Sequence, residues 1–102
     1  MICKAWEVWY AAVKYEDKPT IQDRPVLVLD DKTVYAICLK LTGTSPRPGE
    51  YALIEWAAAG LSKPTTVRVG KVLHMKESDF RRKIGDLTPV DISNVQALLL
   101  GP

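Results

Sequence analysis

Arginine and threonine side chains that could act on a phosphate stand where the predicted strands of this 102-residue chain meet its loops. Arg24 opens a strand directly after a long polar loop, and Thr42 closes the next strand. An arginine is permanently charged and binds a phosphate through two parallel hydrogen bonds. A threonine hydroxyl beside it can position a phosphate oxygen. Together they can stabilise the dianionic charge that builds when a ribose 2′-hydroxyl attacks the adjacent phosphate, a cleavage that needs no metal.

Each candidate also has a structural interpretation. Arg24 could form an ion pair with Asp23 or Asp17. Thr42 could close a turn through its hydroxyl. Arg68, a third candidate in the middle of a later strand, could lie on a solvated strand face. It is the combination of these residues that favours phosphate chemistry.

Several other enzyme classes lack their characteristic residues. The sequence has no glycine-rich phosphate loop, no Cys-x-x-Cys and no His-Glu-x-x-His. His74 is the single histidine, which excludes a histidine acid–base pair and leaves too few ligands for a zinc site. A Ser/His or Cys/His pair would need His74, which we expect at the surface or against a helix. We expect Cys3 and Cys38 to be buried or terminal thiols in a reducing compartment.

Positive charge is concentrated in one stretch of the chain. The net charge is only +2, and residues 1–62 hold seven Lys/Arg against eight Asp/Glu. All seven remaining basic residues lie between Lys63 and Lys83, with two acidic residues among them. Such a segment suits a phosphate-bearing partner, although a helix face exposed to water would have the same composition.

Short antiparallel strands are predicted to carry the candidate residues, because β-branched and aromatic runs alternate with Gly- and Pro-containing loops. The clearest alternation lies in residues 33–42, where Tyr35, Ile37, Leu39 and Leu41 share one face. A tight turn precedes this strand, so we expect a hairpin there. The five predicted strands are residues 5–13, 24–29, 33–42, 50–56 and 65–73.

Proline and glycine refine these elements. Pro25 fits the first position of its strand, where no ladder donor is needed. The polar loop before it, residues 14–23, is long for so small a domain, and such loops are usually functional or mobile. Gly60 could close a single helical turn. Gly70, inside the fifth strand, indicates a bulge, a bend or close backbone approach.

Two helices are expected after the strands. A short helix over residues 79–84 would end at Gly85, a suitable left-handed cap. Thr88, Pro89 and Asp91 form a strong helix start, with threonine as N-cap, proline at the first helical position and an acid at the third. The apolar stripe of this C-terminal helix would consist of Val90, Val95, Leu98 and Leu99, with Ile92 beside it.

These elements predict one α+β domain over residues 1–102, a small and partly closed β-barrel with helices packed on it. The apolar runs are too short to span a bilayer, so no membrane association is expected. The N-terminus has no hydrophobic leader and indicates a cytoplasmic protein.

The sequence resembles the MazF/PemK family of bacterial toxins at ordered positions along most of the chain. The Arg-Pro-Val-Leu-Val-Leu run from Arg24 is the first of these, and the polar loop before it lies where the family has a mobile loop. Trp6 stands where the family usually has glycine. The other matching segments are Glu7-Val8-Trp9-Tyr10, Leu41-Thr42-Gly43, Val67-Arg68-Val69 and Lys83-Ile84-Gly85-Asp86-Leu87-Thr88, the last resembling a junction between two helices.

The resemblance implies an SH3-like barrel with a C-terminal helical segment. It also implies metal-independent, cofactor-free, sequence-specific cleavage of single-stranded RNA, which leaves 2′,3′-cyclic phosphate and 5′-hydroxyl ends. The partners would be a second copy in a homodimer and an antitoxin that covers the RNA groove. By resemblance, Arg24 and Thr42 are the catalytic pair. The residues expected to contact RNA are Arg68, Lys71, Thr20, Gln22, Thr44 and Ser45.

Departures from the family keep two other functions open. One branch of the family has an aspartate acid/base group where this chain has Gly70, which has no side chain to transfer a proton. The polar loop also lacks the family's common residues. The alternatives are a catalytically inactive barrel that binds RNA or a peptide, and an unrelated barrel in which no groove joins Arg24 and Thr42. Trp6 and Trp56 could lie at an interface, stack bases or complete the core.

Overall fold

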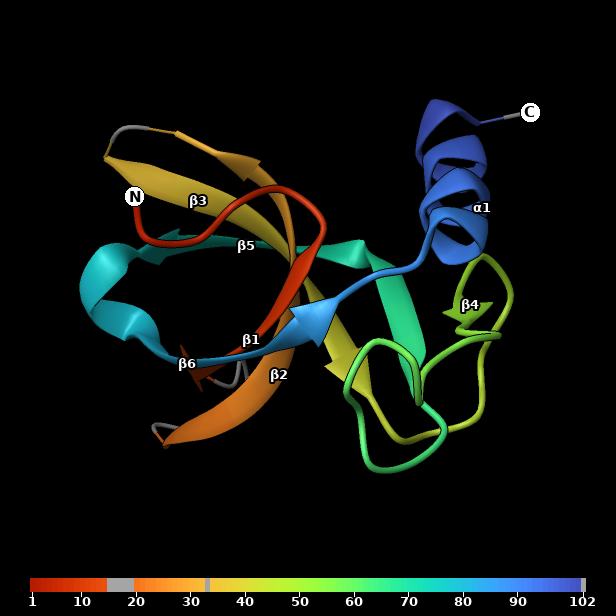
Figure 1. The fold of residues 1–102 in the computed structure, drawn as a ribbon, viewed down its shortest axis with the longest axis horizontal. Helices are drawn as coiled ribbons and strands as arrows, with labels where there is room; N and C mark the ends of the chain where they lie inside the picture. The colour runs from red at the N-terminus through yellow and green to blue at the C-terminus, as the bar shows by residue number, and fades with distance from the viewer. Residues whose placement is uncertain (15–19, 33, 102) are drawn as a thin grey trace.

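Residues 1–14, 20–32 and 34–101 are described by the computed structural model, and in these ranges the chain forms six antiparallel strands and one α-helix (Figure 1). The strands lie in one sheet in the order β4-β5-β3-β2-β1-β6. Residues 15–19 of the predicted loop over residues 14–23, Asp17 among them, lie outside this description, as does Thr33. The rest of the loop prediction is largely wrong: residue 14 ends one strand and residues 21–23 begin the next, so Arg24 is the fourth residue of its strand and does not open it. The elements are β1 (Glu7–Lys14), β2 (Ile21–Asp31), β3 (Tyr35–Thr42), β4 (Tyr51–Ala52), β5 (Thr66–Lys76), a 3₁₀ turn (Glu77–Asp79), β6 (Phe80–Asp86) and α1 (Pro89–Leu100).

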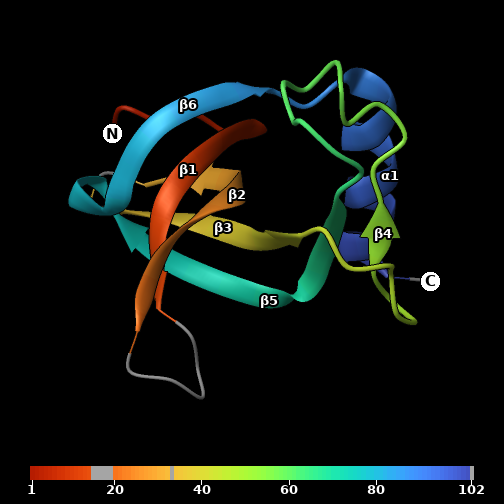
Figure 2. The ribbon, with the colours of Figure 1, turned by 90° about the horizontal axis from the view of Figure 1, so that it is seen from below.

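The sheet curls into an open barrel, and β6 arches over from the side opposite β5 (Figure 2). A turn over residues 55–60 lies between the two edge strands, β4 and β6. Within this turn the Ala59 amide donates to the Glu55 carbonyl at 3.2 Å. Gly60, with φ of 91°, closes this turn as predicted. The turn packs so closely on β6 that a methyl group on Gly85 would lie 2.1 Å from the Ala59 carbonyl oxygen. The predicted α+β architecture with a partly closed barrel is confirmed.

Two buried clusters form the core, one on each face of the central strands. Val26 and Val28 join the first cluster, while Leu27 between them joins the second. Both faces of β2 are covered, which explains why its apolar residues run on without polar alternation. In β3 the predicted period of two holds: Cys38 belongs to the first cluster, whereas Leu39 belongs to the second. The second cluster reaches Val95 of α1, and Trp6 and Trp56 pack against it half-buried.

The helix predicted over residues 79–84 is wrong, because this segment pairs with β1 as strand β6. Ala11 pairs with Phe80 and Glu7 with Asp86, so hydrogen bonds that a helix would make locally come from a distant strand. The Phe80 ring contacts Trp9 edge-on, with ring centroids 5.6 Å apart. Gly85 therefore lies in a strand and not at a helix cap, and the segment 83–88 joins a strand to a helix.

The fourth predicted strand, residues 50–56, shortens to the two residues of β4. The chain leaves the sheet because the amides of Ile54 and Glu55 donate to the Asp91 carboxylate, at 2.9 and 2.8 Å. Asp91 is fully buried at the start of α1. The predicted helix start is confirmed, with Thr88 as N-cap and Pro89 as the first helical residue. Asp91, however, caps the neighbouring segment and not its own helix.

The predicted apolar stripe of α1 is only partly correct. Val95 is fully buried and Ile92 is half-buried, but Val90, Leu98 and Leu99 are 48%, 40% and 41% exposed. The helix stands at one end of the barrel, so the sheet covers its first turns and not its last (Figure 1). Within the described residues, no helix is both long and apolar enough to cross a membrane.

Two further predictions concern backbone irregularities. Pro25 lies inside β2 and not at its start, one residue before pairing with β3 begins at Val26. At Pro25, β2 pairs with β1 but not with β3, so the missing amide proton costs no hydrogen bond to β3. The bulge predicted at Gly70 is confirmed, because Leu39 pairs with Val72 while the next residue of β3 pairs with Arg68. The intervening residues of β5 bend the strand.

Candidate functional site

An open groove of about 780 Å³ lies at the end of the barrel where β2 and β3 stop pairing. The last pair between the two strands joins Val26 to Lys40. Beyond it, β3 continues for two residues to Thr42, and β2 continues through Pro25 and Arg24 to Ile21. The same register continued by two residues sets Arg24 opposite Thr42. Both residues line the groove, so the structure joins the two side chains that the sequence analysis singled out.

The groove collects four of the eight predicted site residues. Arg24, Thr42, Thr44 and Arg68 line it, although Arg68 comes from β5, far along the chain. The four predicted residues that are not among its lining residues are Thr20, Gln22, Ser45 and Lys71.

Although Gln22 does not line the groove, it contacts Arg24, which does. Its side-chain Oε1 accepts a hydrogen bond from Nη2 of Arg24 at 2.8 Å. The two residues are neighbours on one face of β2, because side chains two apart in a strand point the same way. Gln22 thus orients the guanidinium. Asp23, which the sequence offered as an ion-pair partner for Arg24, forms an ion pair with Arg81 at 3.4 Å.

Thr42 and Thr44 form a hydroxyl pair at the end of β3. Their Oγ1 atoms lie 3.1 Å apart, and the amide of Thr44 donates to Thr42 Oγ1 at 3.3 Å. Thr66, which is buried, donates its hydroxyl to the Thr44 carbonyl at 2.8 Å. The turn interpretation of Thr42 is therefore correct, and the same turn sets its hydroxyl at the edge of the groove.

Arg68 is held by an acidic residue that the sequence analysis did not single out. Its Nε donates to Glu50 Oε2 at 2.9 Å, and both side chains are less than one-fifth exposed. This hydrogen bond from Arg68 lowers the pKa of Glu50 below its ordinary value. The pair fixes the guanidinium while cancelling much of its charge.

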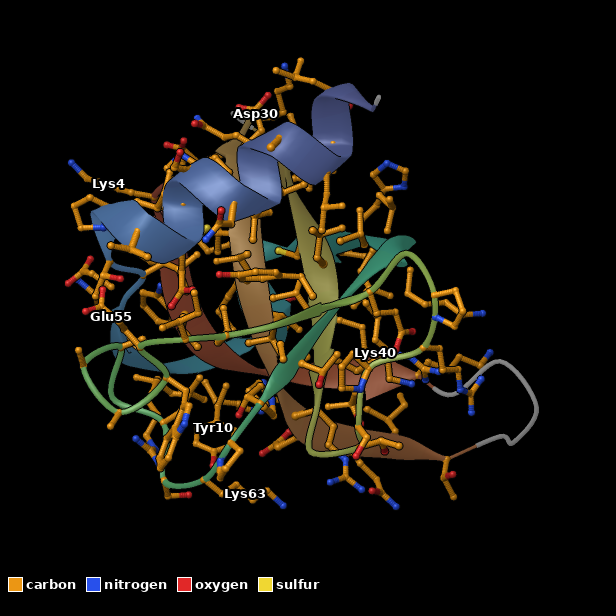
Figure 3. All side chains as sticks on the ribbon, turned by 90° about the vertical axis from the view of Figure 1, so that its right-hand side faces the viewer. Lys4, Tyr10, Asp30, Lys40, Glu55 and Lys63 are labelled. Atoms are coloured by element: carbon orange, nitrogen blue, oxygen red, sulfur yellow. The ribbon has the colours of Figure 1, made fainter. Side chains whose placement is uncertain are left out.

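The groove contains further cations that only the fold brings together. Among the described residues, five cationic side chains and one carboxylate, that of Asp23, line it. In the view of Figure 3, Tyr10, Lys40 and Lys63, which all line the groove, lie below α1. Arg82 lies over the Tyr10 ring with its Cζ 4.5 Å from the centroid. The five cations are Arg24, Lys40, Lys63, Arg68 and Arg82.

The basic segment between Lys63 and Lys83 does not form one face. Its members Lys63, Arg68 and Arg82 line the groove, whereas Lys83 forms ion pairs with Glu7 and Asp86 at 3.0 and 3.1 Å. The concentration of charge in the sequence was the signal for Lys63 and Arg82. Lys40 and Tyr10 lie in strands without such a signal.

Nucleophilic catalysis by cysteine finds no support in this fold. Cys3 and Cys38 are free and fully buried, as expected, and burial raises the pKa of the Cys38 thiol to about 12. His74 lies in β5 outside the groove, with its ring edge-on to Tyr35 at 5.5 Å. No group of three His, Cys, Asp or Glu side chains suited to a metal ion occurs in the ranges described.

Comparison with known proteins places the fold among toxin structures. No protein-family model matches the sequence, and no curated protein matches it either. An endoribonuclease in complex with its cognate antitoxin, from a mycobacterial species, aligns with a TM-score of 0.74 and 16% identity over 95% of this chain and 90% of that one. A mycobacterial endoribonuclease aligns at 0.73 and 14%, covering 95% and 86%. The Mycobacterium tuberculosis toxin MazF-mt6 aligns at 0.73 and 21%, covering 91% of both chains.

These similarities confirm that the chain has the MazF-like fold that its sequence resembles. Trp6 supports the same relationship at one position. Its φ of 69° is in the left-handed region, which glycine adopts most easily. Glycine is the usual residue at this position in the family that the sequence resembles. The Trp6 amide donates to the Val28 carbonyl at 2.6 Å, and its own carbonyl accepts from Leu87 at 2.9 Å.

Proposed function

We propose that this protein is an endoribonuclease of the toxin type, and that its groove cleaves single-stranded RNA. The observation that carries the proposal is the convergence of Arg24, Thr42 and Arg68 in one groove, on a fold shared with solved endoribonucleases. An unrelated barrel with a coincidental Arg-Pro pair would have had no reason to join them.

The chemistry we assign to the groove uses the substrate's own nucleophile. The ribose 2′-oxygen attacks the adjacent phosphorus, the bond from phosphorus to the 5′-oxygen breaks, and the ends are a 2′,3′-cyclic phosphate and a 5′-hydroxyl. Arg24, oriented by Gln22, stabilises the charge that accumulates on the phosphate oxygens. The Thr42 hydroxyl positions one of those oxygens, and Arg68 binds a neighbouring phosphate.

A single-stranded substrate is favoured by what lines the groove. Five cations suit a polyanionic backbone, and Tyr10 with Arg82 offers an aromatic ring and a guanidinium plane on which an unpaired base can stack. A small anionic metabolite would not need cations spread over four strands and a loop.

The partners follow from the same proposal. A protein antitoxin that covers a basic groove would carry acidic residues, and one of the similar structures is an endoribonuclease bound to its cognate antitoxin. We also propose a homodimer, for which the exposed apolar residues Leu98, Leu99 and Leu100 of α1 are available.

Cleavage of a defined single-stranded RNA with EDTA present tests the function. Wild-type protein should cut the RNA and leave a 2′,3′-cyclic phosphate, and a 2′-deoxy nucleotide at the cut position should abolish cleavage. Arg24→Ala should lower the rate by about 10²–10³-fold, or about 2.7–4 kcal/mol, as for loss of one oxyanion donor. Lys4→Ala, which removes an equal charge outside the groove, is the matched control.

The outcomes separate the alternatives. RNA that binds with steeply salt-dependent affinity but stays intact would identify a binding module without turnover. RNA that neither binds nor is cut would overturn the proposed function altogether.

A further inference from the structure

Lys63 lies against the threonine turn that closes β3, although about twenty residues separate them in the chain. A methyl group on Gly43 would lie 3.1 Å from Cε and 3.2 Å from Nζ of Lys63. The ammonium group therefore sits directly beside the Thr42-Gly43-Thr44 turn, and the absence of a side chain at Gly43 leaves room for it. Both Lys63 and the turn line the groove.

Two buried threonines hold the backbone of Lys63 and the backbone of the threonine turn in place. Thr65 donates its hydroxyl to the Lys63 carbonyl at 2.9 Å, and Thr66 donates its hydroxyl to the Thr44 carbonyl at 2.8 Å. Thr65 and Thr66 are 6% and 3% exposed. Adjacent residues of one chain thus hold the backbone of Lys63 and the backbone of the turn, so the two move together.

The Lys63 ammonium differs from Arg68 and Arg24 in where it places its charge. The charge of Arg68 is largely taken up by Glu50, and Arg24 approaches from β2. The hydroxyl pair of Thr42 and Thr44 has no charge of its own. Lys63 supplies a cation directly beside that pair, and Arg24 lines the same groove from β2.

We propose that Lys63 is a further transition-state cation of the cleavage reaction, which binds the phosphate from the Thr42 side while Arg24 binds it from the β2 side. The inference rests on the proposed function. The bond from the 2′-oxygen to phosphorus forms and the bond from phosphorus to the 5′-oxygen breaks. Water accepts the proton from the 2′-hydroxyl and donates one to the leaving 5′-oxygen. Lys63 keeps its proton throughout and acts as a charge.

Three variants test the assignment. Lys63→Met removes the ammonium but keeps an unbranched side chain that is one atom shorter. Gly43→Ala keeps every functional group and displaces the ammonium, and alanine is free of backbone strain there because Gly43 is not in the left-handed region. Lys76→Met, in the same basic segment but outside the groove, is the matched control. Thermal melts of these three variants, and of Lys63→Arg as a conservative replacement, establish that each is folded.

The readouts are the single-turnover cleavage rate with saturating protein and the Kd of the 2′-deoxy RNA analogue. We expect Lys63→Met to lower the rate by about 100-fold, similar to loss of one preorganised donor, with a Kd change no larger than that of Lys76→Met. Gly43→Ala should lower the rate in the same direction, and Lys63→Arg should retain more activity than Lys63→Met.

Contrary results are equally specific. A wild-type rate in folded Lys63→Met, or a loss confined to Kd, would overturn the role of Lys63 while leaving the proposed function intact. Absence of cleavage by wild-type protein would overturn the proposed function itself, before any variant is compared.

Discussion

The carboxylate of Asp91, at the start of α1, accepts a hydrogen bond from the hydroxyl of Tyr51, 40 residues earlier in the chain, at 2.5 Å. The same carboxylate accepts the amides of Ile54 and Glu55, and Asn94 donates its side-chain amide to the Tyr51 hydroxyl at 2.9 Å. One fully buried acid thereby ties the helix to the segment that leads into Gly60 and Lys63 at the groove. Tertiary hydrogen bonds thus connect α1, remote from the site, to one wall of it.

Replacement of Asp91 by alanine should therefore weaken the whole fold. Three donors in a partly buried place lose their acceptor, and we expect the free energy of unfolding to fall by about 2–4 kcal/mol. Urea denaturation followed by circular dichroism measures this. Asp86→Ala removes an acid that is 69% exposed and should change the unfolding free energy by less than about 1 kcal/mol. Equal effects of the two substitutions would contradict the role given to Asp91.

Gly85 is predicted to be intolerant of even a methyl group. Its added Cβ would meet the Ala59 carbonyl oxygen at 2.1 Å, so Gly85→Ala must push the turn over residues 55–60 away from β6. Overpacking of this kind costs about 1–3 kcal/mol, which a thermal melt would show as a lower Tm. Gly70→Ala is the matched control, because nothing lies within 4 Å of its added Cβ. A Tm for Gly85→Ala equal to that of Gly70→Ala would show that the two surfaces do not pack as described.

Glu50 is predicted to restrain the affinity of the groove for RNA. Glu50→Gln removes the negative charge beside Arg68, so the guanidinium offers a fuller charge to a phosphate. We expect tighter binding at low salt, with the slope of log K against log salt steeper by up to about 0.7, the value for one phosphate of a single strand. Asp30→Asn, which frees Lys32 away from the groove, should leave the slope unchanged. An unchanged slope in Glu50→Gln would argue against phosphate binding by Arg68.

Cys38 should make the stability fall at high pH. Burial raises the pKa of its thiol from 9.0 to about 12 in the folded protein, while the unfolded thiol keeps its ordinary pKa. The unfolded state therefore loses its proton first, so stability is fully present below the ordinary pKa and declines as the pH rises towards the folded value. Urea titrations at rising pH measure the decline. It should be shallower in Cys38→Ala, and parallel curves would contradict the burial of the thiol.

Local patterns sufficed for several elements of this fold. The alternation in β3 and the Thr88-Pro89 start of α1 were predictable, because side-chain direction in a strand and capping of a helix depend on neighbours in sequence. Gly60 and Gly70 were equally readable, since turns and bulges are local backbone events. The segment 80–86 was not, because its own residues are compatible with a helix and only pairing with β1 makes it a strand.

The candidate site divides in the same way. Arg24 and Thr42 were identifiable by residue type beside the predicted loops, although Arg24 lies inside β2 and only Thr42 ends its strand. Both side chains line the groove. The pairing of Arg68 with Glu50, and the packing of Lys63 on Gly43, were not identifiable, because each joins segments eighteen or more residues apart.

The sequence by itself determined the strand-rich architecture, the helix start and the two groups best suited to a phosphate, all of which depend on short-range geometry and side-chain chemistry. The tertiary structure alone decided that the basic segment 80–86 is a strand and that five cations line one groove. It also decided that Arg68, among those five cations, forms an ion pair with Glu50. The physical reason is that charge and hydrogen bonding act through space, and the curl of the sheet sets which distant residues come within their reach.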